Sequence, residues 1–418
     1  MRRSDAPSSN RSGTGSSAPR LTRRLLIGPK ASTVILLFLN AVFSGSLGVS
    51  LVLTLNHAGV SKWGIAAFFV VWNVSGAAIN LMPHQWLKGM FSSSTILLGS
   101  SVAVLAGIGL LTWAFAMPLP TILVAALLMA AYSLQYPIYL GRIASEQEPR
   151  ARLGSSMATV RRVWILGYIV GLVLYSGVSL IGWAELEVPL FALLMTFVLQ
   201  VVWRRPRDLR TTPVPRGDSP RVTPRNQMSV LVVLGLAISL LRATDSLRST
   251  YFPLFAQQAG VAAAVISLLF AATAISELVI LRPLGRLGDH AGSTVPLMGV
   301  AAVGICSMAL VASGTSPWTL VGSQVLYAVF TSGFQLFGVQ KFVEASRHAE
   351  RGASLYQGSL QVGGLIGILL PLLIDGYGPG IFLIGSALSA TALVMLFINA
   401  RKEGGANASR DRGNTHAG

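Results

Sequence analysis

The chain is poor in charge and nearly free of cysteine. Only 11% of its 418 residues are charged, and Cys306 is the single cysteine. Soluble domains carry roughly 25% charged residues, so an ordinary soluble globular protein is excluded. One cysteine permits no disulfide within the chain and makes a thiolate metal site unexpected. The sequence also lacks a Gly-x-x-x-x-Gly-Lys-Ser/Thr phosphate loop and metal-ligand spacing of histidines. We therefore expect no cofactor and no enzymatic activity.

Long apolar runs are abundant instead. Apolar residues make up 52% of the chain, and runs of roughly 18 or more with few charges are typical of membrane helices. The sequence predicts an all-α integral membrane protein with twelve transmembrane helices, the sixth of them short. The predicted spans are 33–55, 63–82, 94–115, 119–141, 155–181, 188–203, 229–253, 263–283, 294–313, 318–341, 353–374 and 379–400.

The two halves of the chain repeat each other. Residues 56–60 read Asn-His-Ala-Gly-Val after the first run, and residues 257–261 read Gln-Gln-Ala-Gly-Val after the seventh, 201 positions later. Gln135 in the fourth run matches Gln335 in the tenth, 200 positions later. A nearly constant offset indicates a duplicated unit. Here the unit is six spans, and this plan is known from one large class of secondary transporters.

Composition divides the chain into five segments. Residues 1–31 are rich in Ser, Arg, Gly and Pro, which predicts a disordered N-terminus. Residues 204–227 contain five prolines and no apolar period, which predicts a flexible linker. We therefore expect two six-helix bundles, 32–203 and 228–400, followed by a polar, disordered tail at 401–418.

The formal net charge of +17 is better explained by the orientation of the protein in the membrane than by nucleic-acid binding. Most Lys and Arg residues fall in the termini, the linker and the even-numbered loops, whereas the opposite loops hold only Lys62. This asymmetry predicts that both termini and the linker are cytoplasmic. We expect a monomeric, multi-pass protein of the plasma membrane with lipid contacts and no nucleic-acid partner.

Charged residues inside the spans are the first candidates for a site, because such residues are costly in lipid and usually face a bundle interior or a wet cavity. Span five contains Arg161, preferred as the functional residue, and Arg162. The others are Arg242, Asp245 and Arg248 in span seven and Glu277 in span eight.

The helical rise places these charges at different depths. At ~1.5 Å per residue, Arg242 lies about 21 Å into the membrane and Arg248 near its outer edge. Folding spans seven and eight as a hairpin brings Glu277 to the depth of Arg242, which predicts an Arg242–Glu277 or an Arg242–Asp245 pair. Such a pair is either structural or part of a substrate or proton site. The two interpretations remain open at this point.

Polar stripes run along spans four and ten. Gln324, Tyr327, Thr331 and Gln335 recur on one helical face. A membrane helix has no solvent face, so the stripe must face protein or a water-filled cavity. Amides and phenols along a pathway suit a polar ligand with many hydroxyl groups, and helix–helix contact is the alternative. The predicted substrate-binding residues are Tyr132, Gln135, Arg161, Arg242, Gln324, Tyr327, Gln335 and Tyr356, and the predicted proton-coupling residues are Asp245 and Glu277.

Residues 285–292 read Gly-Arg-Leu-Gly-Asp-His-Ala-Gly. This stretch resembles the loop motif Gly-x-Leu-x-Asp-x-x-Gly of the major facilitator superfamily. The resemblance implies a gate loop formed by Gly285, Asp289 and Gly292, in which Asp289 caps and joins neighbouring helices at the cytoplasmic side. The basic residues usual near the end of the motif are missing, and its first-half counterpart around residues 83–89 is eroded.

Within that superfamily, the second half resembles the bacterial sugar efflux transporter family. Glu277, Ser316-Pro317, Gln324, Phe342 and residues 352–356 carry the resemblance there, and Arg161 and Gly171 carry it in the first half. It implies a secondary active transporter that exports sugars or sugar-like molecules by alternating access, coupled to protons. A multidrug exporter on the same fold is the nearest alternative, and a non-transporting membrane receptor is the alternative from another class.

Overall fold

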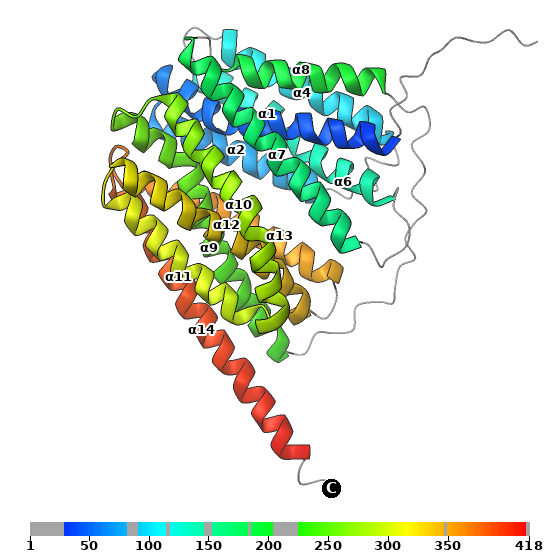
Figure 1. The fold of residues 1–418 in the computed structure, drawn as a ribbon, viewed down its shortest axis with the longest axis vertical. Coiled ribbons are helices and arrows are strands. Elements are labelled where there is room, and N and C mark those ends of the chain that lie inside the picture. The colour runs from blue at the N-terminus through cyan, green and yellow to red at the C-terminus, as the bar shows by residue number, and fades with distance from the viewer. Residues whose placement is uncertain are drawn as a thin grey trace, which may run out of the picture.

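The computed structural model describes residues 29–81, 91–113, 118–145, 153–182, 185–203, 225–346 and 349–414. All regular elements within these ranges are helices (Figure 1). The first half contains α1 (Pro29–His57), α2 (Lys62–Leu81), α4 (Ser93–Trp113), α5 (Leu119–Met129), η1 (Ala130–Leu134), α6 (Gln135–Ser145), α7 (Leu153–Leu180) and α8 (Glu187–Val202). The second half contains α9 (Arg225–Gln258), α10 (Ala263–Ala291), α11 (Thr294–Ala312), α12 (Pro317–Ser346), α13 (Ala349–Leu369), η3 (Leu370–Leu373) and α14 (Gly380–Asn414).

The predicted spans are present as helices. Within the described ranges, 11 helical segments are long and apolar enough to cross a membrane. The remaining span is α8, which has only 16 residues and matches the short sixth run of the sequence. The fourth span is α5, η1 and α6 in series, so a 3₁₀ segment at residues 130–134 interrupts it.

Equivalent helices pack in the same way in the two halves. α1 lies against α7, and α9 lies against α13. A Cβ added at Gly171 of α7 would lie 2.1 Å from the carbonyl oxygen of Val42, and one added at Gly367 of α13 would lie 2.1 Å from that of Ala243. Small residues at these crossings let the backbones approach closely. The duplication seen in the sequence is therefore repeated in the helix packing.

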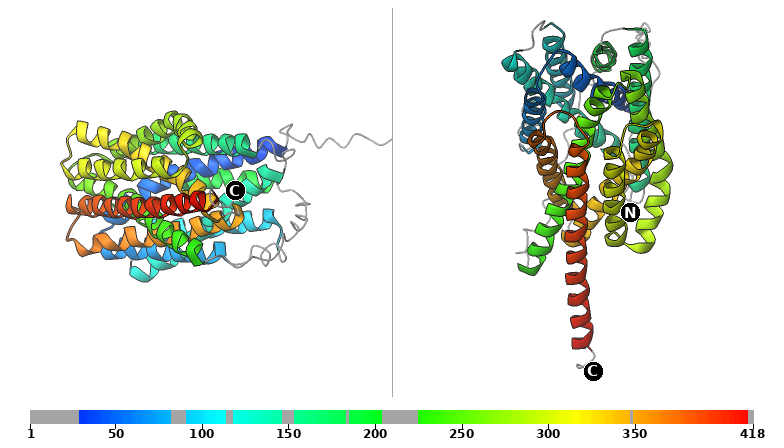
Figure 2. Two further views of the ribbon diagram at one scale, coloured as in Figure 1. Left: turned by 90° about the horizontal axis from the view of Figure 1, so that it is seen from below. Right: turned by 90° about the vertical axis from the view of Figure 1, so that its left-hand side faces the viewer.

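The two bundles meet at the repeat-loop end, which contains residues 56–62 and 257–261. Asn56 Nδ2 donates to Gln257 Oε1 at 2.8 Å. Lys62 Nζ donates to three backbone carbonyl groups between Pro371 and Gly376, at 2.6–2.7 Å. From this end the bundles diverge toward the linker end, where α8 finishes and α9 begins (Figures 1 and 2).

The predicted gate loop is mostly helical. α10 continues through Gly285 to Ala291, well beyond the predicted span end at residue 283, and stops at Gly292. Gly292 has φ 68°, a positive value that glycine adopts without steric cost. The side chain of Asp289 lies outside the described part of the structure, so its capping role stays a prediction.

The segment boundaries also differ in detail. α14 continues to Asn414, so the expectation of a disordered tail from residue 401 is wrong. α9 begins at Arg225, inside the predicted linker. Residues 1–28 and 204–224, which include most of the predicted N-terminal segment and linker, lie outside the described residues.

Candidate functional site

A cavity of about 230 Å³ lies between the two bundles. Its walls come from α7 of the first bundle and from α9, α10 and α12 of the second. The charged lining residues are Arg161, Arg242, Asp245 and Glu277; the aromatic ones are Trp164, Tyr168, Phe270 and Tyr327; the uncharged polar ones are Ser249, Thr273, Thr331 and Gln335; Ile165 and Ala274 complete the wall. The sequence predicted six of these as functional residues, four from charge inside the spans and two from the span-ten stripe, and four helices bring them together.

The ionic residues form two pairs. Arg242 Nη1 contacts Asp245 Oδ2 one turn along α9, which is one of the two predicted pairings. Glu277 does not pair with Arg242, however. Its Oε2 lies 3.4 Å from Nη2 of Arg161, which belongs to the other bundle. The hairpin argument considered only spans seven and eight and therefore missed a partner supplied by α7.

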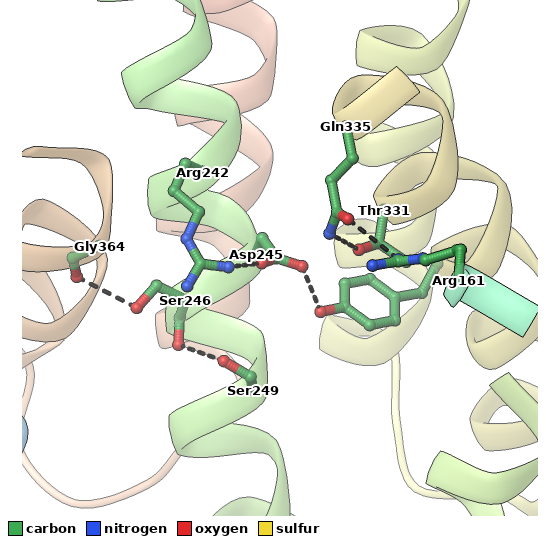
Figure 3. Close-up of polar contacts among 9 residues, drawn as sticks. Arg161, Arg242, Asp245, Ser246, Ser249, Thr331, Gln335 and Gly364 are labelled. Carbon is green, nitrogen blue, oxygen red and sulfur yellow. Dashed lines mark hydrogen bonds and ion pairs between the residues drawn. The ribbon is translucent and has the colours of Figure 1, made fainter. Parts of the chain in front are cut away.

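Hydrogen bonds extend each pair across the cavity (Figure 3). Tyr327 donates its hydroxyl to Asp245 Oδ1 at 2.6 Å, which joins α12 to α9. Arg161 Nη2 donates to Gln335 Oε1 at 3.0 Å, and Gln335 Nε2 donates to Thr331 Oγ1 at 3.2 Å. Within the span-ten stripe, Gln335 thus contacts the arginine of the first bundle, and Tyr327 contacts Asp245 of the second.

An aromatic surface on α7 adjoins Arg161. The rings of Trp164 and Tyr168 stack with centroids 5.2 Å apart and an interplanar angle of 18°. The Arg161 guanidinium lies 5.6 Å from the Trp164 ring centroid. Residues 161, 164 and 168 are spaced i, i+3 and i+7, the period of one helical face. Sequence reasoning missed both aromatic residues, although this spacing from Arg161 was a signal that could have found them.

Gln135 and Tyr132 do not line the cavity. Gln135 is fully buried in the first bundle, where its Oε1 accepts from Asn40 and its Nε2 donates to Ser101 Oγ at 3.1 Å. Tyr132 donates to Asn40 Oδ1 at 2.9 Å. The polar stripe of the fourth span therefore makes helix–helix contacts, the alternative to a ligand-facing stripe, because neighbouring helices satisfy its polar groups.

Gln324 and Tyr356 also lie outside the cavity wall. Gln324 is 1% exposed, and its Oε1 accepts a hydrogen bond from Thr273 Oγ1 at 2.6 Å. Tyr356 is buried, with its hydroxyl 3.4 Å from the backbone oxygen of Gln335. Both residues lie behind groups that do reach the cavity, so their predicted direct contact with a ligand has no support from their positions.

Arg248 is buried, whereas the sequence suggested that its side chain reaches water. Depth along span seven placed it near the outer edge, within reach of water. Instead its side chain is 0% exposed and packs between the rings of Phe252 and Tyr327, at 4.8 and 4.2 Å from their centroids. The estimate used only the position of Arg248 along span seven. It did not include Tyr327 of α12, whose ring covers this arginine.

Comparisons with known proteins agree with this architecture. Residues 234–417 match the family model of the Major Facilitator Superfamily. No curated protein sequence matches the chain significantly.

Solved transporter structures share the fold over most of the chain. A point variant of the nucleoside transporter NupG is similar with a TM-score of 0.73 and 14% identity, over 89% of this chain and 99% of that one. The peptide transporter POT in complex with sulfate has a TM-score of 0.69 and 13% identity, over 89% and 94%. A bacterial homologue of the iron transporter ferroportin in the inward-facing state has a TM-score of 0.66 and 14% identity, over 90% and 99%. The chain is thus a multi-pass membrane protein with the major facilitator superfamily fold.

Proposed function

We propose that this protein is a secondary active transporter that exports sugars or sugar-like molecules by alternating access, coupled to protons. The observation that carries the proposal is the cavity between the bundles, which the Arg161–Glu277 contact crosses from one bundle to the other. Alternating access in repeat-built transporters moves one bundle against the other around a central site. A charge pair shared between bundles would therefore be made and broken during each cycle.

The contacts at the two ends indicate which state this conformation represents. Hydrogen bonds join the bundles at the repeat-loop end, and the bundles diverge toward the linker end. The excess of Lys and Arg places the linker end in the cytoplasm by the positive-inside rule. On this basis the conformation is inward-facing, and opening to the outside requires loss of the Asn56 and Lys62 contacts.

The lining of the cavity supports a hydroxyl-rich ligand of sugar size. Thr273, Thr331 and Gln335 offer hydroxyl and amide groups, which donate to and accept from sugar hydroxyls. The stacked rings of Trp164 and Tyr168 offer a flat apolar surface beside these groups.

Glu277 is the more suitable proton carrier of the two carboxylates. Asp245 has two partners within its own bundle, Arg242 and the hydroxyl of Tyr327. Glu277 contacts a cation only across the bundle interface. A proton on Glu277 would neutralise its attraction for Arg161 and free the bundles to move, whereas a proton on Asp245 would disturb a pair internal to one bundle.

Flux in sealed proteoliposomes tests the proposal. Purified protein should exchange a labelled monosaccharide across the vesicle wall, and an imposed proton gradient should drive its net accumulation. Protein-free vesicles provide the control. Exchange of the sugar without any response to the gradient would disprove proton coupling, and absence of flux for every solute tried would favour a receptor.

The multidrug alternative predicts a different inhibitor profile. Carriers of apolar cations need a carboxylate free to meet the cation, whereas both carboxylates that line this cavity contact arginines. Lipophilic cationic dyes should therefore compete weakly with labelled sugar. Strong competition by the dyes, together with dye flux, would favour the multidrug function.

A further inference from the structure

Positive charge exceeds negative charge around the cavity. Arg161, Arg242, Asp245 and Glu277 line it in two pairs. Arg248 lies directly behind the wall, against the ring of Tyr327. Among the described residues that line the cavity or lie directly behind its wall, three thus carry a guanidinium group and two carry a carboxylate. An uncompensated charge in a membrane interior is costly unless something of opposite sign meets it.

The arginines also occupy the exposed positions of their pairs. The side chains of Arg161 and Arg242 are each 32% exposed, whereas those of Glu277 and Asp245 are 15% and 6% exposed. A ligand in the cavity therefore finds more accessible surface on the two arginine side chains than on either carboxylate. Guanidinium groups are suited to bind carboxylate or phosphate oxygens with two parallel hydrogen bonds.

Arg248 is the source of the imbalance. It is fully buried, and its Nε and Nη1 atoms have no hydrogen-bond partner. Its Nη2 lies 3.4 Å from Ser323 Oγ, a neutral group. The cation instead rests on the face of Tyr327, whose hydroxyl donates to Asp245. Arg248 and Arg242 thus both lie beside the Tyr327–Asp245 hydrogen bond, Arg248 against the Tyr327 ring and Arg242 against the Asp245 carboxylate.

We propose that the substrate carries one acidic group on its hydroxyl-rich body, as a sugar acid does, and that Arg161 and Arg242 bind this group. The inference rests on the transport function proposed above and specifies its substrate class. One negative charge offsets the excess guanidinium charge, which a neutral sugar leaves uncompensated and a cation increases. Arg248 is a positioning residue that supplies charge from behind the wall without touching the ligand.

Matched pairs of sugars test the substrate class in proteoliposomes. D-glucose and D-glucuronate differ only in replacement of a hydroxymethyl group by a carboxylate, as do D-galactose and D-galacturonate. At neutral pH, exchange of the acid should be about tenfold or more efficient than exchange of its neutral parent in at least one pair, a difference near 1.4 kcal/mol. Equal or better exchange of both neutral sugars overturns the acidic-substrate inference and leaves sugar transport intact. Failure of all four compounds to exchange refutes the proposed sugar transport itself.

Variants test the roles of Arg242 and Arg248. Arg242→Gln should lower the preference for the acid by about tenfold. Arg162→Gln should leave it unchanged, because Arg162 follows Arg161 on α7 but is exposed and does not line the cavity.

Arg248→Lys retains the charge and should retain the preference for the acid, whereas Arg248→Met should lose it. Equal preference in folded Arg248→Lys and Arg248→Met proteins would show that the buried charge does not act on the site. Should Arg248→Met fail to fold, the Arg242→Gln and Arg162→Gln comparison decides the inference alone: equal loss in both, or no loss in Arg242→Gln, overturns it.

Discussion

Asn56 and Gln257 hydrogen-bond to each other, and they occupy equivalent positions in the two repeats, 201 residues apart. Repeats of this kind are related by an axis along the membrane normal. A residue can meet its own equivalent only close to such an axis. The pair therefore marks the centre of the repeat-loop end, where the bundles must separate if the cavity is to open on that side.

Cross-linking at this position should stop transport. Asn56→Cys and Gln257→Cys, combined with Cys306→Ser to remove the exposed native thiol, should be joined by a short bismaleimide. The joined bundles cannot separate at the repeat-loop end, so flux should fall in proportion to the cross-linked fraction. Gel mobility after cleavage at a protease site engineered into residues 204–224 measures that fraction. Single-cysteine proteins treated alike should remain active, and full flux in completely cross-linked protein would exclude an opening at this end.

Removal of the Glu277 carboxylate should impair uphill transport more than exchange. Glu277→Gln keeps the size of the side chain but cannot release a proton, so gradient-driven accumulation should fall by about tenfold or more while counterflow exchange falls much less. Both rates are measured on the same proteoliposomes. Glu277→Asp retains a carboxylate and should retain part of the accumulation. Equal losses of both activities in normally folded Glu277→Gln protein would argue for a purely structural contact with Arg161.

The crossing of α1 and α7 should be sensitive to one added methyl group. Gly171→Ala places a Cβ 2.1 Å from the Val42 carbonyl oxygen, so the helices must move apart. We expect a loss of about 1–3 kcal/mol in the free energy of unfolding, seen as a lower Tm in detergent. Gly177→Ala is the matched control on the same helix, because a Cβ there meets nothing within 4 Å. Similar Tm values for the two variants would show that close approach at Gly171 does not limit stability.

The matching glutamines of the two repeats should have different roles. Gln135→Leu removes the hydrogen bonds that Gln135 makes with Asn40 Nδ2 and Ser101 Oγ inside the first bundle and should destabilise the protein by about 1–3 kcal/mol. The KM of the protein that still folds should stay near the original value. Gln335→Leu removes a partner of Arg161 at the cavity wall and should raise KM with a smaller effect on Tm. The reverse pattern, a KM effect confined to Gln135→Leu, would contradict the placement of the site in the cavity between the bundles.

Much of the fold was predictable because its determinants are local. Twelve apolar runs gave the spans, since an apolar run of sufficient length must cross the bilayer or be buried wherever it lies. The offset between the repeat loops and between Gln135 and Gln335 gave the two-bundle arrangement. The gate motif was less informative, because α10 continues through Gly285 to Ala291 where the motif suggested a loop.

The sequence by itself determined which polar groups are confined within the membrane, because a charged or amide side chain in an apolar run must find a partner away from lipid. Only the tertiary structure decided what those partners are. Glu277 meets Arg161 of the other bundle, and Gln335 reaches the cavity while Gln135 is buried between helices. The physical reason is that helical spacing fixes the face on which a side chain lies, whereas the packing of helices distant in the chain fixes what that face meets.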